Sequence, residues 1–338
     1  SEQRDLLQNS IIGVLLPHIQ SFRTAARIFV VDTRWAVEQN DGRLVVQDIQ
    51  TMLGLARQAT DSNTLVGTLV GFAVAGMAFN QLEEVLVEAP DLLQEAELAE
   101  LQRTIENISL RDWVKLEGER AMLHDIIQRV YTDDGNGDGR ITSSGLKTLE
   151  LVTAMSSLED FPELDGYPEL IHVARKAAEP ASLFVMASRK ETTETGDALI
   201  DVFKEELAKP FWESRDLEVE EFLQNNRWKH AVLSRLFPAI EAIKRATDRT
   251  VGRLDGVIAA IAIHRYHLKY GQWPDSFDQI SPEFVAQFPL DQINGEFLKF
   301  RIDDDGPIVY SVGNDRDDDG GILDDNQRHT GRYPAAHF

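Results

Sequence analysis

Residues 254–274 read LDGVIAAIAIHRYHLKYGQWP, and this stretch decides how the last part of the chain folds. Its apolar residues recur at three- and four-residue intervals, which is the pattern of one face of an α-helix. Gly271 suits the position just after a helix, and Pro274 prevents the helix from continuing. The pattern predicts a helix from near His230 to Tyr270, whose apolar face carries Leu254, Val257, Ile258, Ile261 and Leu268.

Two strands are predicted after this helix. In residues 296–302 and 307–312 apolar and polar side chains alternate, which is the pattern of a half-buried strand. The short segment 303–306 between them makes the pair a β-hairpin. Ahead of the strands, Ser281 followed by a proline predicts an N-cap and a short helix over residues 282–287. The end of the chain is therefore expected to form a small α+β module.

The chain ahead of the long helix is predicted to be helical as well. Apolar positions fit helical faces over most of residues 1–130, with an interruption at Pro17. The polar run Ser188–Gly196 is predicted to be a loop or a solvated helix end. The helical pattern returns in three later stretches, which are residues 146–155, 170–177 and 197–208.

The longest apolar run, Leu65–Phe79, has fifteen residues, whereas a membrane-spanning helix needs about 20. Small residues recur every four positions within it, a spacing that lets two helices approach closely, at Gly67, Gly71 and Ala75. We interpret this run as a buried helix of a bundle. The fold is thus expected to be mainly α, with a helical, repeat-like domain over residues 1–229 and a long helix plus α+β module over residues 230–338.

The composition restricts the classes of partner. The 338 residues carry a formal net charge of −23, which argues against nucleic acid, because phosphate binding needs clustered Lys and Arg. It also argues against docking on anionic lipid. The absence of cysteine excludes disulfides, thiolate metal sites and cysteine nucleophiles. The chain begins at Ser1 rather than Met, which is what removal of an upstream leader or anchor would leave.

The order of these features resembles a known family. The helix ends in YHLKYGQWP (266–274), then PLD (289–291) follows, and the second strand leads into YSVGND (310–315). This order is similar to the globular part of the major pseudopilin of type II secretion, over about residues 255–326. The resemblance implies a pseudopilin-like module with a structural calcium ion in its final loop. In this chain Gln292 stands where the family carries Pro, and a long helical region replaces the family's own N-terminal assembly helix.

The whole layout also resembles bacterial extracytoplasmic proteins of unknown role that place such a module behind a helical domain. This second resemblance implies an extracytoplasmic location, either periplasmic or membrane-anchored and facing the periplasm. It implies no specific activity.

An acidic loop follows the second strand, and its spacing is typical of calcium sites. Calcium takes six to eight oxygen ligands, and alternating acidic residues point every second side chain toward the ion. The alternating positions here are Asp315, Asp317 and Asp319. Gly320 permits the sharp turn at the sixth position, and two more carboxylates follow, Asp324 and Asp325. Because Asn326 replaces the bidentate Glu of an EF-hand, we expect calcium at residues 315–326 as a structural clamp rather than a tight sensor.

A second loop, over residues 133–145, shares this spacing, with candidate ligands Asp134, Asn136 and Asp138. It lies between two predicted helices, 116–131 and 146–155, which is the helix–loop–helix context of an EF-hand. Its twelfth position is Gly145, which supplies no side-chain oxygen. We expect a weaker calcium site here, and the alternative is a Gly-rich turn with an Asp cap.

The sequence contains no motif of a serine hydrolase, a zinc protease, a P-loop or a dinucleotide site. His264 and His267 lie one helical turn apart, but no carboxylate at matching spacing accompanies them, so we interpret them as packing residues. The sequence therefore favours a non-enzymatic, extracytoplasmic scaffold or binding protein with protein partners and calcium-stabilised loops, related to secretion. Two alternatives stay open, which are a hydrolase-type enzyme with an interhelical site and a pilus-type assembly subunit.

Overall fold

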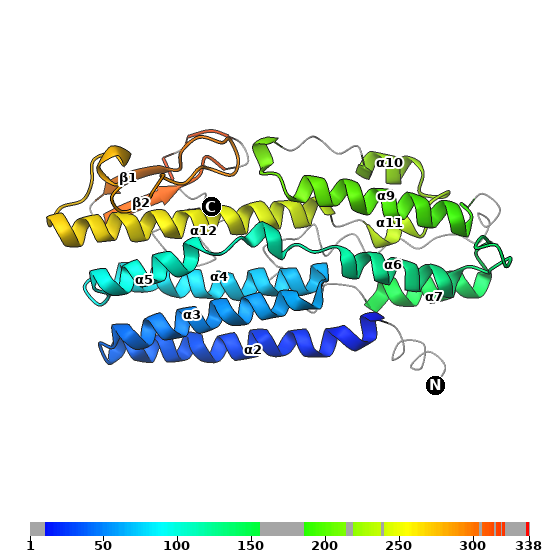
Figure 1. Cartoon of the computed structure of the whole chain (residues 1–338), viewed down its shortest axis with the longest axis horizontal. Coiled ribbons are helices and arrows are strands. Elements are labelled where there is room, and N and C mark those ends of the chain that lie inside the picture. Colours follow the sequence, from blue (N-terminus) through cyan, green and yellow to red (C-terminus); the bar gives the residue numbers. More distant parts are fainter. Residues whose placement is uncertain are drawn as a thin grey trace.

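The computed structural model describes residues 11–155, 186–213, 219–237, 240–303, 306–313, 316–318, 320–321 and 336–337. Its helices run side by side along the long axis of the molecule, and a small sheet lies against one end of the longest helix (Figure 1). The fold is mainly α with a C-terminal β-hairpin, so the predicted fold class is confirmed. The helix predicted at 170–177 lies outside the described residues.

Residues 11–106 form four helices, α2 (Ile11–Glu38), α3 (Gly42–Ala59), α4 (Leu65–Glu88) and α5 (Glu95–Glu106). The connections include two 3-10 turns, η1 (Thr60–Ser62) and η2 (Leu110–Trp113). The later helices are α6 (Glu117–Val130), α7 (Ser143–Met155), α9 (Arg189–Leu207), α10 (Val219–Asn225), α11 (Leu233–Leu236) and α12 (Ile240–Tyr270). Two more 3-10 turns are η7 (Phe211–Glu213) and η8 (Phe277–Gln279).

Polar side chains set the beginnings of several helices. Asp41, Thr64 and Ser188 each accept a hydrogen bond from the backbone N–H three residues further on, at 3.0, 3.1 and 3.3 Å. Each residue thereby satisfies one of the N–H groups that the first turn of a helix leaves unpaired. The polar run that starts at Ser188 is therefore the capped beginning of α9. Of the two predicted forms, a loop or a solvated helix end, the structure has the helix end.

The interruption predicted at Pro17 is wrong, because α2 runs through it. Helices of this kind gain most of their stability from tertiary packing rather than from local propensity. The later turns of α2 pack against α3 and α4, and Ala26, Thr33 and Ala36 are buried there. This packing supports the helix on the C-terminal side of Pro17.

Among the described residues, α4 is the one helix long and apolar enough to cross a membrane, and 67% of its most apolar window is buried inside the protein. Two of its glycines touch the end of α3. A Cβ at Gly67 would lie 2.7 Å from the Ala59 carbonyl oxygen, and one at Gly71 would lie 2.9 Å from that of Ala56. The predicted close approach of two helices is therefore confirmed at these glycines.

The longest helix, α12, is the central helix of the fold. Its residues Val257–Ile263 are all buried. One side of α12 packs against α4 and α5, and another side carries β2 (Figure 1). Because the same helix serves both regions, the division of the chain at residue 230 stays a prediction.

The module carries the predicted hairpin, formed by β1 (Lys299–Asp303) and β2 (Gly306–Tyr310). The two strands are antiparallel, with Arg301 opposite Ile308. A short third strand, β3 (Ala336–His337), pairs with β2 in parallel, so the sheet order is β1-β2-β3.

The short helix predicted over residues 282–287 is wrong, because this segment forms turns that follow η8. An N-cap side chain accepts a hydrogen bond from a backbone N–H. The Ser281 hydroxyl instead donates to the Ala286 carbonyl oxygen at 3.2 Å. The residue that suggested a helix start therefore closes a turn.

Two glycine substitutions test the contact between α3 and α4. We expect Gly71→Ala to destabilise the protein by about 1–3 kcal/mol, because the new methyl group overpacks a site bounded by the Thr60 methyl group and the Ala56 carbonyl oxygen. Gly54→Ala is the matched control, because a Cβ at this α3 position meets nothing within 4 Å. This control should be stabilising by about 1 kcal/mol, the difference in helix propensity. Urea unfolding of both variants measures the two effects, and a stabilising Gly71→Ala would contradict the close approach.

Candidate functional site: a polar junction on α12 and two acidic loops

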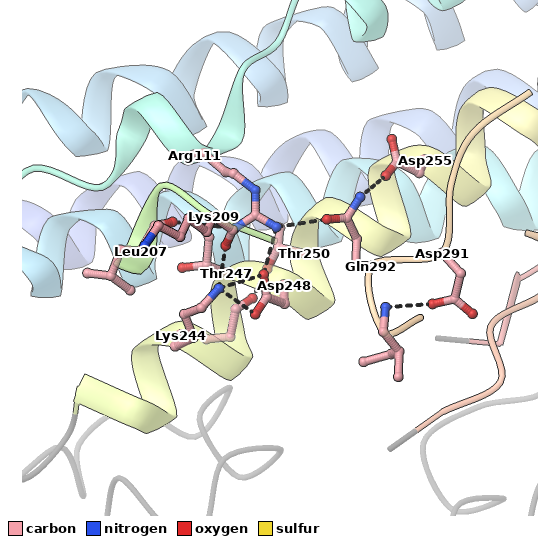
Figure 2. A network of polar contacts seen from close by, with 12 residues as sticks. Arg111, Leu207, Lys209, Lys244, Thr247, Asp248, Thr250, Asp255, Asp291 and Gln292 are labelled. Atoms are coloured by element: carbon pink, nitrogen blue, oxygen red, sulfur yellow. Dashed lines mark hydrogen bonds and ion pairs between the residues drawn. The ribbon is translucent and has the colours of Figure 1, made fainter. Parts of the chain in front are cut away.

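A largely buried polar junction lies where the helical bundle meets the α+β module, with Arg111 of η2 at its centre (Figure 2). The Arg111 Nη2 atom donates to Asp248 Oδ1 and to Gln292 Oε1, each at 2.7 Å. Its Nη1 atom donates to the Lys209 carbonyl oxygen at 3.0 Å. One guanidinium group therefore connects η2, α12, the end of α9 and the module loop that carries Gln292.

Lys244 brings a second cation to this junction. Its ammonium group donates to the Lys209 carbonyl oxygen and, at 3.1 Å, to Asp248 Oδ2. Lys209 lies just beyond the C-terminal end of α9, where the helix dipole favours positive charge. Burial lowers the pKa of Lys244, and the neighbouring Asp248 carboxylate opposes that shift. The Asp248 carboxylate thus lies between two cations, both of which also bind the end of α9.

Asp255 completes the network seven residues further along α12 (Figure 2). Its Oδ2 atom accepts a hydrogen bond from Gln292 Nε2 at 2.7 Å. Burial raises the pKa of Asp255 to about 7, against the opposing effects of the Gln292 hydrogen bond and the Arg111 charge. The Gln292 amide is therefore held at both ends, with a cation at its oxygen and a carboxyl group at its nitrogen.

The chemistry of this junction is positioning. The hydrogen-bonding groups of Arg111, Lys244 and Gln292 are bonded to protein acceptors and donors from four segments of the chain. Such a set fixes the module relative to the bundle. Sequence reasoning did not find this network, and the one signal in the sequence was Gln292, as the departure from the pseudopilin pattern.

The adjacent residue, Asp291, holds the loops of the module together. Its side chain is 2% exposed. Oδ1 accepts from the Ser311 hydroxyl at 2.9 Å and from the Ile293 N–H at 2.8 Å, while Oδ2 accepts from the Val312 N–H at 2.8 Å. Hydrogen bonds to an ionised carboxylate are shorter and stronger than neutral ones. Asp291 therefore joins the loop before β1 to the segment after β2.

The acidic loop at residues 133–145 connects α6 to α7, so its predicted helix–loop–helix context is confirmed. The loop is closed as a narrow hairpin by an antiparallel bridge between Tyr131 and Ile141. At its tip, Asp134 Oδ1 accepts hydrogen bonds from the backbone N–H groups of Asn136 and Asp138, at 2.8 and 3.1 Å. The carboxylate of Asp134 thus shapes the turn itself.

Asp138 of this loop is directed at the start of α9. Its Oδ1 atom accepts from the Lys190 N–H at 3.0 Å and from the Gly139 N–H at 2.8 Å. The Lys190 N–H, together with Ser188 and Gly139, lowers the pKa of Asp138 to about 2. The neighbouring Asp133 forms an ion pair with Arg189. Both carboxylates therefore stabilise the N-terminal end of α9, where a helix favours negative charge.

Of the predicted ligands in the acidic loop at residues 315–326, Asp317 is described and exposed. The remaining four lie outside the described residues, namely Asp315, Asp319, Asp324 and Asp325. Asp318, which the calcium spacing leaves out, binds the module. Its carboxylate accepts from the Tyr310 hydroxyl at 3.1 Å and pairs with Lys299 Nζ at 3.1 Å. The loop is therefore attached to the hairpin at this position.

The two histidines of α12 pack on Trp273, with ring centroids 5.2 Å away for His264 and 4.0 Å for His267. Burial and the nearby His267 lower the pKa of His264 to about 4. These ring contacts agree with their interpretation as packing residues. Within the ranges that the structure describes, no group of three His, Asp or Glu side chains is arranged to hold a metal ion.

Comparison of the chain with protein-family models, with curated proteins and with solved structures finds no match.

The raised pKa of Asp255 predicts how stability depends on pH. A carboxyl group with a folded-state pKa near 7 and an unfolded pKa near 4 binds its proton more tightly in the folded state. The free energy of unfolding should therefore fall as pH rises through this interval, by roughly 1–3 kcal/mol for this group between pH 5 and 8. Asp255→Asn should remove this part of the dependence while keeping an oxygen that accepts from Gln292.

The measurement is urea unfolding of the protein and the variant at four pH values from 5 to 8. Burial also raises the pKa of Glu119 to about 7 and that of Asp48 to about 6. Both proteins share Glu119 and Asp48. The difference between their curves of unfolding free energy against pH therefore isolates the contribution of Asp255. We expect the variant to gain stability relative to the parent as pH rises, and parallel curves would contradict this account.

Proposed function

We propose that the protein is a non-enzymatic, extracytoplasmic binding protein, in which a helical bundle presents a pseudopilin-like module whose terminal acidic loop binds calcium. The order of segments 266–274, 289–291 and 310–315 supports the pseudopilin-like part. The resemblance to extracytoplasmic proteins with the same layout supports the location, and the pseudopilin resemblance supports the relation to secretion.

The observation that carries this proposal is the attachment of Asp318 to Lys299 and Tyr310. This attachment holds the loop against the hairpin. Asp317, an exposed carboxylate of the predicted calcium spacing, is next to it. The Gly320 N–H also bonds Asp318 Oδ1, at 3.2 Å, which shapes the turn that a calcium loop needs.

The polar junction supports the scaffold part of the proposal. Arg111 and Asp248 join the bundle to the loop of Gln292, and Asp291 joins that loop to the end of β2. These contacts are distributed over several elements and fix the orientation of the module. A protein that presents a surface to a partner benefits from such preorganisation, because less conformational freedom is lost on binding.

Calcium titration by calorimetry and thermal melting tests the proposal. We expect a heat of binding at one site. We also expect the melting temperature to rise by roughly 4 °C at calcium concentrations about 100-fold above Kd, because the ion binds only the folded loop. Chelation should reverse the rise. No heat and no shift of the melting temperature would contradict the calcium site.

Matched variants locate the site. Asp317→Asn and Asp319→Asn should each lose most of the heat, because each removes a charged ligand. Glu205→Gln, on the exposed side of α9, removes one charge far from the loop and should bind like the parent. Asp134→Asn reports on the acidic loop at residues 133–145, where the Asp134 carboxylate already bonds backbone N–H groups, and should reduce the heat little.

A further inference from the structure

The most exposed large apolar side chains among the described residues form one row on α2. They are Ile28, Val31 and Trp35, which are 65%, 68% and 52% exposed. Residues three and four positions apart are neighbours on a helix surface, so the three side chains are adjacent. Single exposed apolar residues are ordinary, whereas a contiguous group marks an interaction surface.

The helical bundle does not account for this row. The opposite face of α2, with Ala26, Thr33 and Ala36, is buried against α3 and α4. Figure 1 shows α2 at the outer edge of the bundle, and α3 and α4 both lie on its inner side. The helix thus has one apolar face inside the fold and a second one toward solvent.

The spacing of the row is that of a coiled-coil seam. Ile28 and Trp35 take two successive a positions, and Val31 takes the d position between them. In this heptad Arg27 and Arg34 fall at g positions, and Asp32 falls at an e position. Arg34 already pairs with Glu84 of α4 at 3.4 Å. The seam therefore has Arg27 and the Arg34–Glu84 pair on one side and Asp32 on the other.

This distribution of charge matches a second copy of the same helix in parallel orientation. In a parallel pair each g residue faces the e residue five positions later in its partner, so Arg27 faces Asp32 of the second copy. In an antiparallel pair g residues face g residues and e residues face e residues, so Arg27 would lose Asp32 as its partner. We propose that the Ile28–Val31–Trp35 row is the interface of a parallel dimer of this chain.

The seam is short, and this sets the strength of the dimer. Three apolar residues from each copy bury less area than the interface of a stable complex. The acidic chains also repel one another, since each carries a net charge of −23. We therefore expect a weak dimer, populated at roughly 10–100 µM protein. The inference is independent of the calcium site.

The chain contains no cysteine, so single-cysteine variants report the interface directly. Ile28→Cys and Glu38→Cys occupy a and d positions, and each should form a disulfide between two copies under mild oxidation. Val202→Cys, a 40% exposed position on α9, is the control and should stay monomeric. An antiparallel pair places a positions opposite d positions, so it would instead link Ile28→Cys to Glu38→Cys only when the two variants are mixed, and that outcome would overturn the proposal.

Sedimentation velocity over a concentration series tests association without a crosslink. The parent should shift toward the dimer at high concentration, and Val31→Glu should abolish the shift, whereas Val202→Glu should not. Arg27→Glu should weaken association several-fold, and the double variant Arg27→Glu, Asp32→Arg should restore it. A parent protein that stays monomeric at 200 µM overturns the proposal. It is overturned equally if the monomer binds anionic lipid vesicles through the Ile28–Val31–Trp35 row.

Discussion

The burial of α12 is the constraint on which the rest of the fold depends. Over Val257–Ile263 every residue is buried, so this part of the helix needs cover on all sides. A helix that is apolar all round cannot lie on the surface of a bundle in water. The bundle helices α4 and α5 cover one side, and the hairpin strand β2 covers another. The small module is therefore part of the core and completes it.

Covering an apolar helix with a loop-rich module creates a second requirement, which is to satisfy the polar groups that become buried with it. Buried N–H and carboxyl groups without partners destabilise a fold. Asp291 meets this need inside the module by accepting from Ile293 and Val312 N–H groups. Gln292 meets it at the boundary by bonding both Arg111 and Asp255. Asp291 thus satisfies polar groups inside the module, and the next residue, Gln292, satisfies them at the boundary with the bundle.

The sequence predicts those parts of the structure whose signals are local. Hydrophobic periodicity predicts α12, and alternation of side chains predicts β1 and β2, because each pattern reflects the geometry of one element. The junction could not be predicted, because Arg111 meets Asp248 and Gln292 across 137 and 181 residues. The errors at Pro17 and at residues 282–287 have a related cause, since local rules there were overridden by packing and by a turn.

The charged residues of α12 explain how an apolar helix keeps one orientation. Apolar surfaces alone tolerate rotation and sliding, whereas an ion pair that loses its partner inside the protein is strongly destabilising. Asp248 pairs with Arg111 of η2, Arg253 with Glu83 of α4, and Arg265 with Glu95 of α5, each at 2.7 Å. The Asp248 and Glu83 carboxylates are buried, whereas Glu95 is half exposed and its pair contributes less. The three pairs lie between residues 248 and 265 of α12 and reach three different elements. Rotation of α12 would break all of them together, and because Arg111 also holds Gln292, the module takes its position from the same set of charges.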